Sequence, residues 1–329
     1  MPETIMTNRR CVLFSLALLA STRQALAEPA MDAMRFVVGY PAGGTLDLIA
    51  RKLAEKLAPH HARQVLVDNK PGAAGRLAVD EVRRATPDGS VVLLTPASVV
   101  TMYPHVYRQL AYDPFADLVP VSPVCTSAFA LAVGARVPQS VTTVEGFARW
   151  CKANPAAAQC GNAGAGSMPH LMALLLAREL KLDLGHIPYR GGQLAMQAAA
   201  AGEVTAALAT EAAARALDQS GRLRVLATSG RERSPFFPSV PTFAGQGLAA
   251  LTVSEWFGVL APARTPTATV ESTARVLHAA LQDGQVQETW AQAGLLPASS
   301  SPAQLAATMR QEHAFWGSLV KATGFTPET

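Results

Sequence analysis

Three glycine-containing segments could bind a small anion through backbone N–H groups. The first, PAGGTLD, covers residues 41–47, the second, GNAGAGSMPH, covers 161–170, and the third, PYRGG, covers 188–192. Each lies between an apolar run and a run with helical spacing, which predicts a strand-to-helix turn. The first turn of a helix has unpaired N–H groups and the positive end of the helix dipole, and both favour a carboxylate. A turn with nothing bound is the alternative for each segment.

The first segment is not a nucleotide-binding loop. No lysine follows Gly43 and Gly44, as a Walker A loop requires, and the glycines lack the G-x-G-x-x-G spacing. Thr45 is the predicted N-cap of the following helix. Asp47 places a carboxylate in the same first turn and has two interpretations: it complements the helix dipole, or it accepts a hydrogen bond from the ligand.

The second segment contains a candidate nucleophile and base, Ser167 and His170. They define a rival function, an exported α/β hydrolase or transferase. No third group is placed to orient the histidine, however, and the chain has no G-x-S-x-G or H-E-x-x-H motif. The histidines also lack metal-ligand spacing, so we predict no catalytic residue, no metal and no cofactor. In the third segment, Arg190 could pair with a carboxylate through two hydrogen bonds, and a solvated surface arginine is the alternative.

Composition excludes two classes of protein. Of the 329 residues, 49% are hydrophobic and 16% are charged, which supports a sizeable core and excludes a disordered chain. The formal net charge is +4, with no cluster of lysines and arginines in the mature part of the chain. Nucleic acid is therefore not an expected partner.

The N-terminus predicts export. Residues 8–10 include two arginines, CVLFSLALLA is apolar but shorter than the roughly 20 residues of a membrane span, and ALA at 25–27 fits a cleavage site. We predict a signal peptide over 1–27, cleaved near Ala27 and Glu28, and a periplasmic protein without direct membrane insertion. Sec and twin-arginine export both stay open.

Cleavage leaves three cysteines, Cys125, Cys151 and Cys160. Export permits a disulfide, and Cys151 and Cys160 flank a short segment, KANPAAAQ, that could close into a loop. A Cys151–Cys160 disulfide and two unpaired thiols are both compatible with the sequence. Cys125 is then expected to be a small buried hydrophobic residue.

The elements alternate between strands and helices, which predicts βαβ units and a parallel sheet. The first half contains strands at 35–40, 64–67 and 90–95, and the pattern resumes after residue 128. A long strand at 251–262 and the helices after residue 266 are expected to return to the first half. We therefore predict a discontinuous first lobe, 28–128 with 254–329, and a second lobe, 129–253. Two crossings, near 126–130 and 251–257, would join the lobes around a ligand cleft.

The whole mature chain resembles the Bug family, also called the TctC family, of extracytoplasmic solute-binding receptors. Some of these receptors serve tripartite tricarboxylate transporters. The resemblance rests on ordered landmarks: VVGYPAGGTLDLIARKLAEKL, VLVDNKPGAAGRLAVDEV, TPDGSVVLL, YDPFADLVPVS, GNAGAGSMPHL, HIPYRGG, SGRLRVLATSGRERS, FPSVPTF and EWFGVLAPARTP. Any one of them would be weak evidence alone. Their order along the chain makes the match specific.

The resemblance implies an α/β periplasmic-binding-protein fold whose two lobes close on a small carboxylate. The family's first-lobe loop maps onto Pro41, Ala42, Gly43, Gly44, Thr45 and Asp47. Its second-lobe loop maps onto Asn162, Ala163, Gly164, Ala165, Gly166 and Ser167. Further candidates in the turns are His170, Tyr189, Arg190 and Gly191.

The chain departs from the family where the far end of the ligand is expected. Two positions that are usually acidic in the family are occupied here by Thr205 and Ala209. Thr210 and Glu211 come directly after Ala209, so Glu211 places a carboxylate nearby. The third strand ends in TPAS instead of Gly-Thr, so Thr95, Ala97 and Ser98 are further candidates. The identity of the ligand is therefore left open, together with the roles of Asp47 and Glu211 in choosing it.

The resemblance implies a periplasmic receptor that captures a carboxylate metabolite for a tripartite tricarboxylate-type transporter. The alternative role is a sensory receptor for the same ligand class that signals to a membrane kinase. The expected partners are the small carboxylate and either transporter subunits or a sensor kinase. We expect a monomer.

Overall fold

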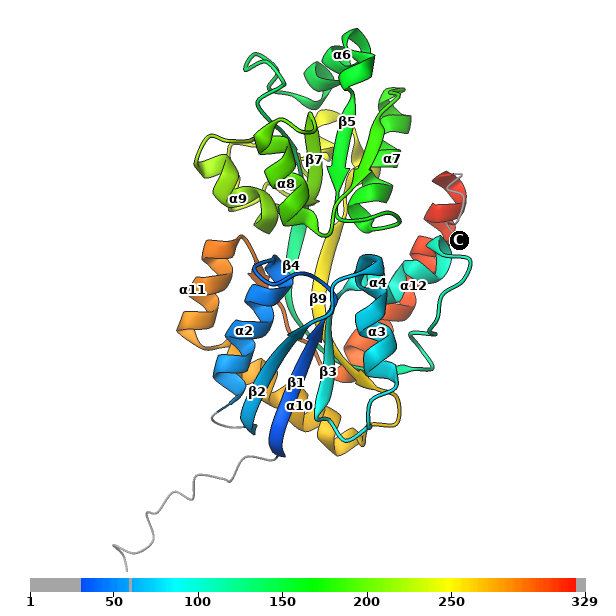
Figure 1. Cartoon of the computed structure of the whole chain (residues 1–329), viewed down its shortest axis with the longest axis vertical. Helices are drawn as coiled ribbons and strands as arrows, with labels where there is room; N and C mark the ends of the chain where they lie inside the picture. The colour runs from blue at the N-terminus through cyan, green and yellow to red at the C-terminus, as the bar shows by residue number, and fades with distance from the viewer. Residues whose placement is uncertain (1–30, 59–60, 324–329) are drawn as a thin grey trace, which may run out of the picture.

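The chain folds into two α/β lobes joined by two long strands (Figure 1). This computed structural model describes residues 31–58 and 61–323. The two-lobe fold expected for a periplasmic binding protein is confirmed. The predicted signal peptide lies outside the described residues, so the structure does not test it.

The first lobe is built on three parallel strands in the order β2-β1-β3. They are β1 (Met31–Val38), β2 (Ala62–Asn69) and β3 (Val91–Pro96). Helices α2 (Thr45–Leu57) and α3 (Arg76–Arg83) connect them, with a short 3₁₀ turn, η1 (Ala73–Gly75), before α3. Residues 36–38 of β1 are fully buried because helices cover both faces of a parallel sheet.

The second lobe repeats the strand–helix alternation. Its strands are β5 (Gln159–Asn162), β6 (Gly185–Pro188), β7 (Ala206–Thr210) and β8 (Arg224–Thr228). Its helices are α6 (Val144–Ala153), α7 (Met168–Leu180), α8 (Gly192–Ala201) and α9 (Glu211–Gln219), with the 3₁₀ turns η2 (Pro155–Ala157), η3 (Ala244–Gln246) and η4 (Ala249–Leu251). The sequence pattern missed β5, because QCGN is too short and too glycine-rich to show a strand period.

Two long strands, β4 (Leu118–Val133) and β9 (Ser254–Pro262), run between the lobes (Figure 1). The prediction of a parallel sheet is wrong for both: β9 is antiparallel to β3 and β4, and β4 is antiparallel to β7 and β8. The return of the chain to the first lobe reverses the strand direction. The register of β4 shifts between Pro120 and Ser122 and between Pro123 and Cys125, consistent with prolines that cannot donate to the ladder.

The C-terminal elements pack on the first lobe (Figure 1). They are α10 (Thr267–Leu281), α11 (Gly284–Ala293), β10 (Leu296–Pro297) and α12 (Pro302–Thr323). Two short helices, α4 (Ala97–Thr101) and α5 (Tyr103–Val106), follow β3. The C-terminal segment therefore lies with the N-terminal half in space.

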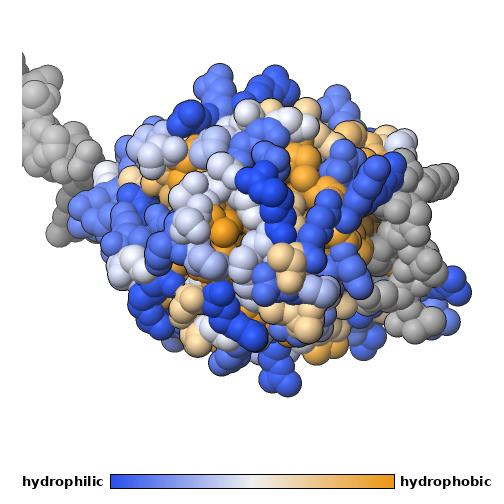
Figure 2. All heavy atoms as spheres, turned by 90° about the horizontal axis from the view of Figure 1, so that it is seen from above, coloured by the Kyte–Doolittle hydropathy of each residue, from blue (hydrophilic) through white to orange (hydrophobic). Residues whose placement is uncertain are grey.

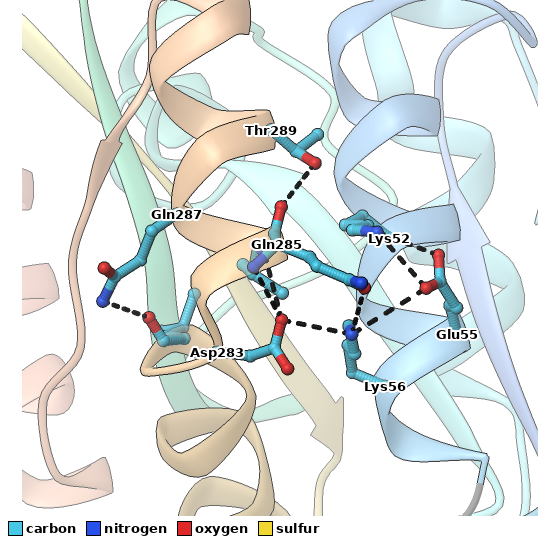
Figure 3. Close-up of polar contacts among 9 residues, drawn as sticks. Lys52, Glu55, Lys56, Asp283, Gln285, Gln287 and Thr289 are labelled. Carbon is cyan, nitrogen blue, oxygen red and sulfur yellow. Dashed lines mark hydrogen bonds and ion pairs between the residues drawn. The ribbon is translucent and has the colours of Figure 1, made fainter.

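Helix α2 is held against α11 by a cluster of polar side chains (Figure 3). The Lys56 ammonium donates to Gln285 Oε1 at 2.6 Å and lies 3.1 Å from Asp283 Oδ1. Asp283 is also the N-cap of α11, accepting hydrogen bonds from two backbone N–H groups. These contacts fix the C-terminal end of α2, whose N-terminal end faces the space between the lobes.

The three cysteines of the described chain are free and buried. The Cys151–Cys160 disulfide is therefore not formed, and the alternative of two unpaired thiols holds. Burial raises the pKa of the Cys151 thiol to about 11 and that of Cys160 to about 12, so both are protonated at neutral pH. Cys125 is a buried residue of the first-lobe core, as predicted.

The surface is polar where Figure 2 shows it, above the second lobe: hydrophilic residues cover most of this face, and hydrophobic residues emerge in small separate areas. No helix within residues 31–58 and 61–323 combines the length and apolar character needed to cross a bilayer. The same ranges contain no group of three or more metal-ligating side chains.

Candidate ligand-binding site

A cavity of about 320 Å³ lies between the lobes, a size typical of small-molecule sites. Elements of both lobes line it, including the starts of α2, α7, α8 and α9. The predicted residues that line it are Pro41, Ala42, Gly43, Gly44, Thr45, Ser98, Ala163, Ser167, Arg190, Gly191 and Thr210. The three glycine-containing turns therefore meet at one cavity.

The first turn is organised by Asp47. Its Oδ2 atom accepts a hydrogen bond from the Gly43 N–H at 2.9 Å and lies 2.9 Å from Arg51 Nε. Gly43 has a φ of 80°, which glycine adopts without strain. The N-cap position of α2 is Gly44, and no side chain caps it, so the prediction of Thr45 as the N-cap is wrong. Asp47 reaches back from inside the first turn, and Thr45 is already helical.

Asp47 is ionised and turned away from the cavity. Its residue is 4% exposed and does not line the cavity wall. Burial raises the pKa of Asp47, but hydrogen bonds from Arg51 and the Gly43 N–H outweigh this effect and hold the pKa below its usual value. Between the two interpretations of Asp47, this geometry favours dipole complement over ligand contact.

The second turn is organised by His170. Its Nδ1 atom accepts a hydrogen bond from the Gly166 N–H at 2.9 Å. A backbone N–H can only donate, so Nδ1 carries no proton in this arrangement. Burial lowers the pKa of His170, which favours the neutral imidazole. His170 lies behind the turn and does not line the cavity.

Two polar side chains of the second turn have atoms available for a ligand or water. The Ser167 hydroxyl lines the cavity, is buried and has no hydrogen-bond partner within the described structure. Asn162 accepts from the Gly164 N–H through Oδ1 at 3.2 Å, whereas its Nδ2 atom is buried and has no partner there. Since the Ser167 hydroxyl makes no hydrogen bond, the nucleophile–base pair with His170 is not formed.

The third turn brings a cation to the mouth of the cavity. Arg190 is exposed and lines both this cavity and an adjoining hollow, where Tyr189 faces residues 71–74. Gly191 has a φ of 124°, and a Cβ there would lie 3.9 Å from Pro41 Cδ. The turn of one lobe therefore approaches the turn of the other.

The two lobes touch beside the cavity. The Tyr107 hydroxyl, from the first lobe, donates to the Ala165 carbonyl at 2.6 Å. A Cβ at Gly164 would lie 3.4 Å from Ala74 Cβ. The Arg76 guanidinium lies 3.8 Å from the centre of the Tyr107 ring. The first two contacts join the lobes in a closed arrangement, whereas Arg76 and Tyr107 both belong to the first lobe.

Ten predicted residues do not line the cavity: Asp47, Thr95, Ala97, Asn162, Gly164, Ala165, Gly166, His170, Tyr189 and Glu211. Glu211 differs most from expectation. It is 3% exposed, accepts from the Ser234 hydroxyl at 2.7 Å, and lines a separate hollow near the start of β9. Burial raises the pKa of Glu211 to about 6.

Most of the residues in the cavity wall, including one acidic residue, were not predicted from the sequence. The missed lining residues are Tyr40, Leu46, Pro96, Phe129, Met168, Pro169, Gly192, Gln193, Leu194, Gln197, Ala209, Ala213, Glu255 and Phe257. Glu255 is 4% exposed, and its Oε1 accepts the Ser98 N–H at 2.9 Å. Burial raises the pKa of Glu255 to about 7. The sequence did contain a signal for Glu255. It is an acidic residue in SEWFGVLAP, an otherwise apolar strand, and acidic residues are rarely buried.

Known proteins are similar to this chain in sequence and fold. Residues 49–325 match the family model described as tripartite tricarboxylate transporter family receptor. Protein BugT of Bordetella pertussis is 30% identical, over 88% of this chain and 89% of its own. The periplasmic binding protein BugD has a TM-score of 0.84 and 29% identity, over 91% of this chain and 100% of its own. The Rhodopseudomonas palustris protein Rpa4515, solved with adipate, has a TM-score of 0.85 and 27% identity, over 92% of this chain and 100% of its own.

The family model covers most of the chain, and the three glycine-containing turns meet at one cavity between the lobes. The protein belongs to the tripartite tricarboxylate transporter receptor family, the TctC or Bug family of periplasmic solute-binding proteins.

Proposed function

We propose that this receptor captures a small carboxylate in the cavity between its lobes and presents it to a tripartite tricarboxylate-type transporter. One observation carries the proposal: the N-terminal ends of α2 and α7, from different lobes, open onto one cavity. The first turns of these helices offer unpaired N–H groups to an anion. The similarity to Rpa4515, solved with adipate, supports the same ligand class.

Arg190 supplies the positive charge of the proposed site. It is the one basic residue among the described residues that line the cavity. Its position at the mouth suits an approaching carboxylate, because hydrogen bonds between ionised groups are stronger than neutral ones. We place the ligand against Arg190 and the first- and second-lobe turns, with the Ser167 hydroxyl as a further donor.

We propose that the lobes open and close about β4 and β9, with 28–128 and 254–329 as one body and 129–253 as the other. The bond from Tyr107 to Ala165 would then form only on closure. The predicted signal peptide would direct the chain to the periplasm, where a monomer would act. N-terminal sequencing of the exported protein should begin within a residue or two of Glu28, and a retained leader would contradict this.

Calorimetric titration with linear mono- and dicarboxylates tests the proposed function. We expect saturable binding at one site per chain. Arg190→Gln should weaken it about 10-fold or more, the effect of losing one charge-assisted hydrogen bond. Arg222→Gln is the matched control, because Arg222 is exposed and does not line the cavity. Failure of every carboxylate to bind would refute the proposal.

Two further measurements separate the alternatives. Incubation with each bound carboxylate should give no product, and turnover that disappears in Ser167→Ala would instead indicate the hydrolase or transferase. Uptake of the ligand should fail in cells lacking the receptor. Normal uptake together with a lost transcriptional response would support the sensory role.

A further inference from the structure

Glu255 is a buried acid without a cation. It is the second residue of β9, lines the cavity and is 4% exposed. Its Oε1 atom accepts the Ser98 N–H at 2.9 Å. No lysine, arginine or histidine forms an ion pair with it within residues 31–58 and 61–323. A buried carboxylate is costly unless it is paired, so a group from outside the chain is a candidate partner.

The titratable neighbours of Glu255 cannot neutralise it. Burial raises the pKa of Glu312, on α12, to about 7, so Glu312 adds a second negative charge only when it is ionised; it accepts a hydrogen bond from the Trp256 indole at 3.0 Å. The phenols of Tyr40 and Tyr103 are the other titratable groups that interact with it, and burial raises the pKa of both, so they stay neutral. Arg190 lines the same cavity, but it makes no ion pair with Glu255. The neighbouring elements therefore supply hydrogen bonds from Ser98 and no cation to Glu255 within the described residues.

Much of the cavity wall is apolar. Phe129, Phe257, Pro96, Leu46 and Met168 line the cavity together with Glu255. Such a wall favours a ligand with a hydrocarbon body, and the few polar groups fix the orientation of that ligand. The charged side chains among the described lining residues are Arg190, which suits a carboxylate as the helix N-termini do, and Glu255, which repels one when ionised. The neutral polar side chains in the wall include Ser98, Ser167, Gln193 and Gln197.

We propose that Glu255 determines specificity by selecting carboxylates that also carry a hydrogen-bond donor, a hydroxyl or an ammonium group, on a short hydrocarbon body. Glu255 accepts a hydrogen bond from that donor and discriminates against a second carboxylate. The inference rests on the proposed function, since it assumes that the cavity binds one carboxylate. It concerns the other end of the ligand.

Protonation of Glu255 should change this preference. Burial raises the pKa of Glu255 to about 7, hydrogen bonds from Ser98 oppose that rise, and the charge of Glu312 adds to it. At pH 8 the ionised carboxylate accepts from a ligand donor and repels a second carboxylate. At pH 6 the protonated acid tolerates that carboxylate. Dicarboxylate affinity should therefore fall as pH rises from 6 to 8, whereas affinity for donor-bearing ligands should rise.

The experiment is calorimetric titration at pH 6 and pH 8 with ligands that differ only at one end. The six-carbon set is hexanoate, 6-hydroxyhexanoate, 6-aminohexanoate and adipate, and the four-carbon analogues form a second set. The full mature protein is compared with Glu255→Gln and with Glu312→Gln. The second variant is the matched control, because it removes a neighbouring half-buried carboxyl that does not line the cavity. Circular dichroism confirms that each variant is folded.

At pH 8 the wild type should bind a hydroxyl- or ammonium-bearing ligand at least about 10-fold tighter than the matching dicarboxylate, the effect of one hydrogen bond to a charged group. Glu255→Gln should abolish this preference and its pH dependence, and Glu312→Gln should keep the preference. If only the amine binds more tightly than the dicarboxylate, the natural ligand carries an ammonium group. If the alcohol shows an equal preference, the natural ligand carries a hydroxyl group.

Several outcomes would overturn the inference. One is a wild-type preference for the dicarboxylate at pH 8; another is a donor preference that survives in Glu255→Gln. If Glu255→Gln does not fold, wild-type affinities that do not change between pH 6 and pH 8 contradict the proposal on their own. In all these cases the carboxylate site itself still stands. Absence of binding by every ligand at both pH values would instead refute the proposed function and this inference together.

Discussion

The turns before α2 and α7 share one geometry and differ in one charge. In each turn a glycine N–H donates to a side chain four residues later: Gly43 to Asp47 and Gly166 to His170, both at 2.9 Å. The acceptor is an ionised carboxylate in the first lobe and a neutral imidazole in the second. The first acceptor also pairs with Arg51, whereas burial keeps the second uncharged.

This difference predicts unequal roles for the two turns in the proposed carboxylate site. Asp47 offsets the positive end of the α2 dipole, whereas the α7 turn keeps its positive potential. The second turn also meets the opposite lobe, because a Cβ at Gly166 would lie 2.7 Å from the Tyr107 hydroxyl. A Cβ at Gly43 would meet no protein atom within 4 Å. The second turn should therefore contribute more to carboxylate affinity and to lobe closure than the first.

Gly166→Ala should have the largest effect and Gly43→Ala is its matched control. Both glycines have positive φ, so either alanine should lower the free energy of unfolding by about 1–2 kcal/mol. Only the methyl group at 166 collides with Tyr107 and Val106 in the closed arrangement. Overpacking of this kind costs about 1–3 kcal/mol, so carboxylate affinity should fall roughly 10- to 100-fold in Gly166→Ala. Equal losses of affinity in the two variants would break the comparison.

Acid should weaken the second turn before the first. A folded-state pKa of His170 below its unfolded value means that its contribution to stability is complete above about pH 6.5 and declines as pH falls below it. The lowered pKa of Asp47 means that its contribution is complete above its usual value of 3.8 and is lost only in stronger acid. Hydrogen exchange at pH 5 and pH 7, corrected for intrinsic rates, should show lost protection at the Gly166 amide alone. Parallel changes at the Gly43 amide would contradict this.

Asp47→Asn should sharpen the comparison by removing the charge and keeping the shape. The asparagine oxygen can still accept from Gly43, while the α2 dipole is no longer offset. Carboxylate affinity should then rise by up to about 5-fold, because a charge at a helix end is worth about 0.3–1 kcal/mol. Arg51→Gln is the control for which carboxylate affinity should fall, since this substitution leaves the Asp47 charge unpaired. A large loss of affinity in Asp47→Asn would mean that Asp47 contacts the ligand.

Thr45→Ala should have the smallest effect. The Thr45 side chain makes no capping hydrogen bond, so the roughly 1 kcal/mol usually lost with an N-cap is not expected here. Urea denaturation should place the variant within about 0.5 kcal/mol of the wild type, as for most surface substitutions. A loss near 1 kcal/mol would show that Thr45 caps the helix in solution.

Local sequence patterns predicted most of the elements and the positions of all three turns. Apolar runs of 4–8 residues that end in glycine or proline report on strands directly, as in β1 and β3. The same signals failed in β5, which has only four residues. They also showed only the end of β4, since Pro120 and Pro123 interrupt its strand pattern.

The sequence by itself therefore determined the two-lobe fold class and the three turns that meet at the cavity. Only the tertiary structure decided which side chains in those turns face the cavity. Asp47 and His170 bend back onto glycines of their own turns, leaving Ser167 and Arg190 at the cavity wall.

The position of Glu255 shows the physical reason most clearly. Its hydrogen-bond partner, Ser98, is 157 residues away, and the two meet because β9 returns antiparallel beside β3. Periodicity and turn residues report on neighbours along the chain, whereas this contact depends on the direction in which a distant strand re-enters the sheet. The sequence therefore predicted where an anion could bind, and the return of β9 decided which acid would lie beside it.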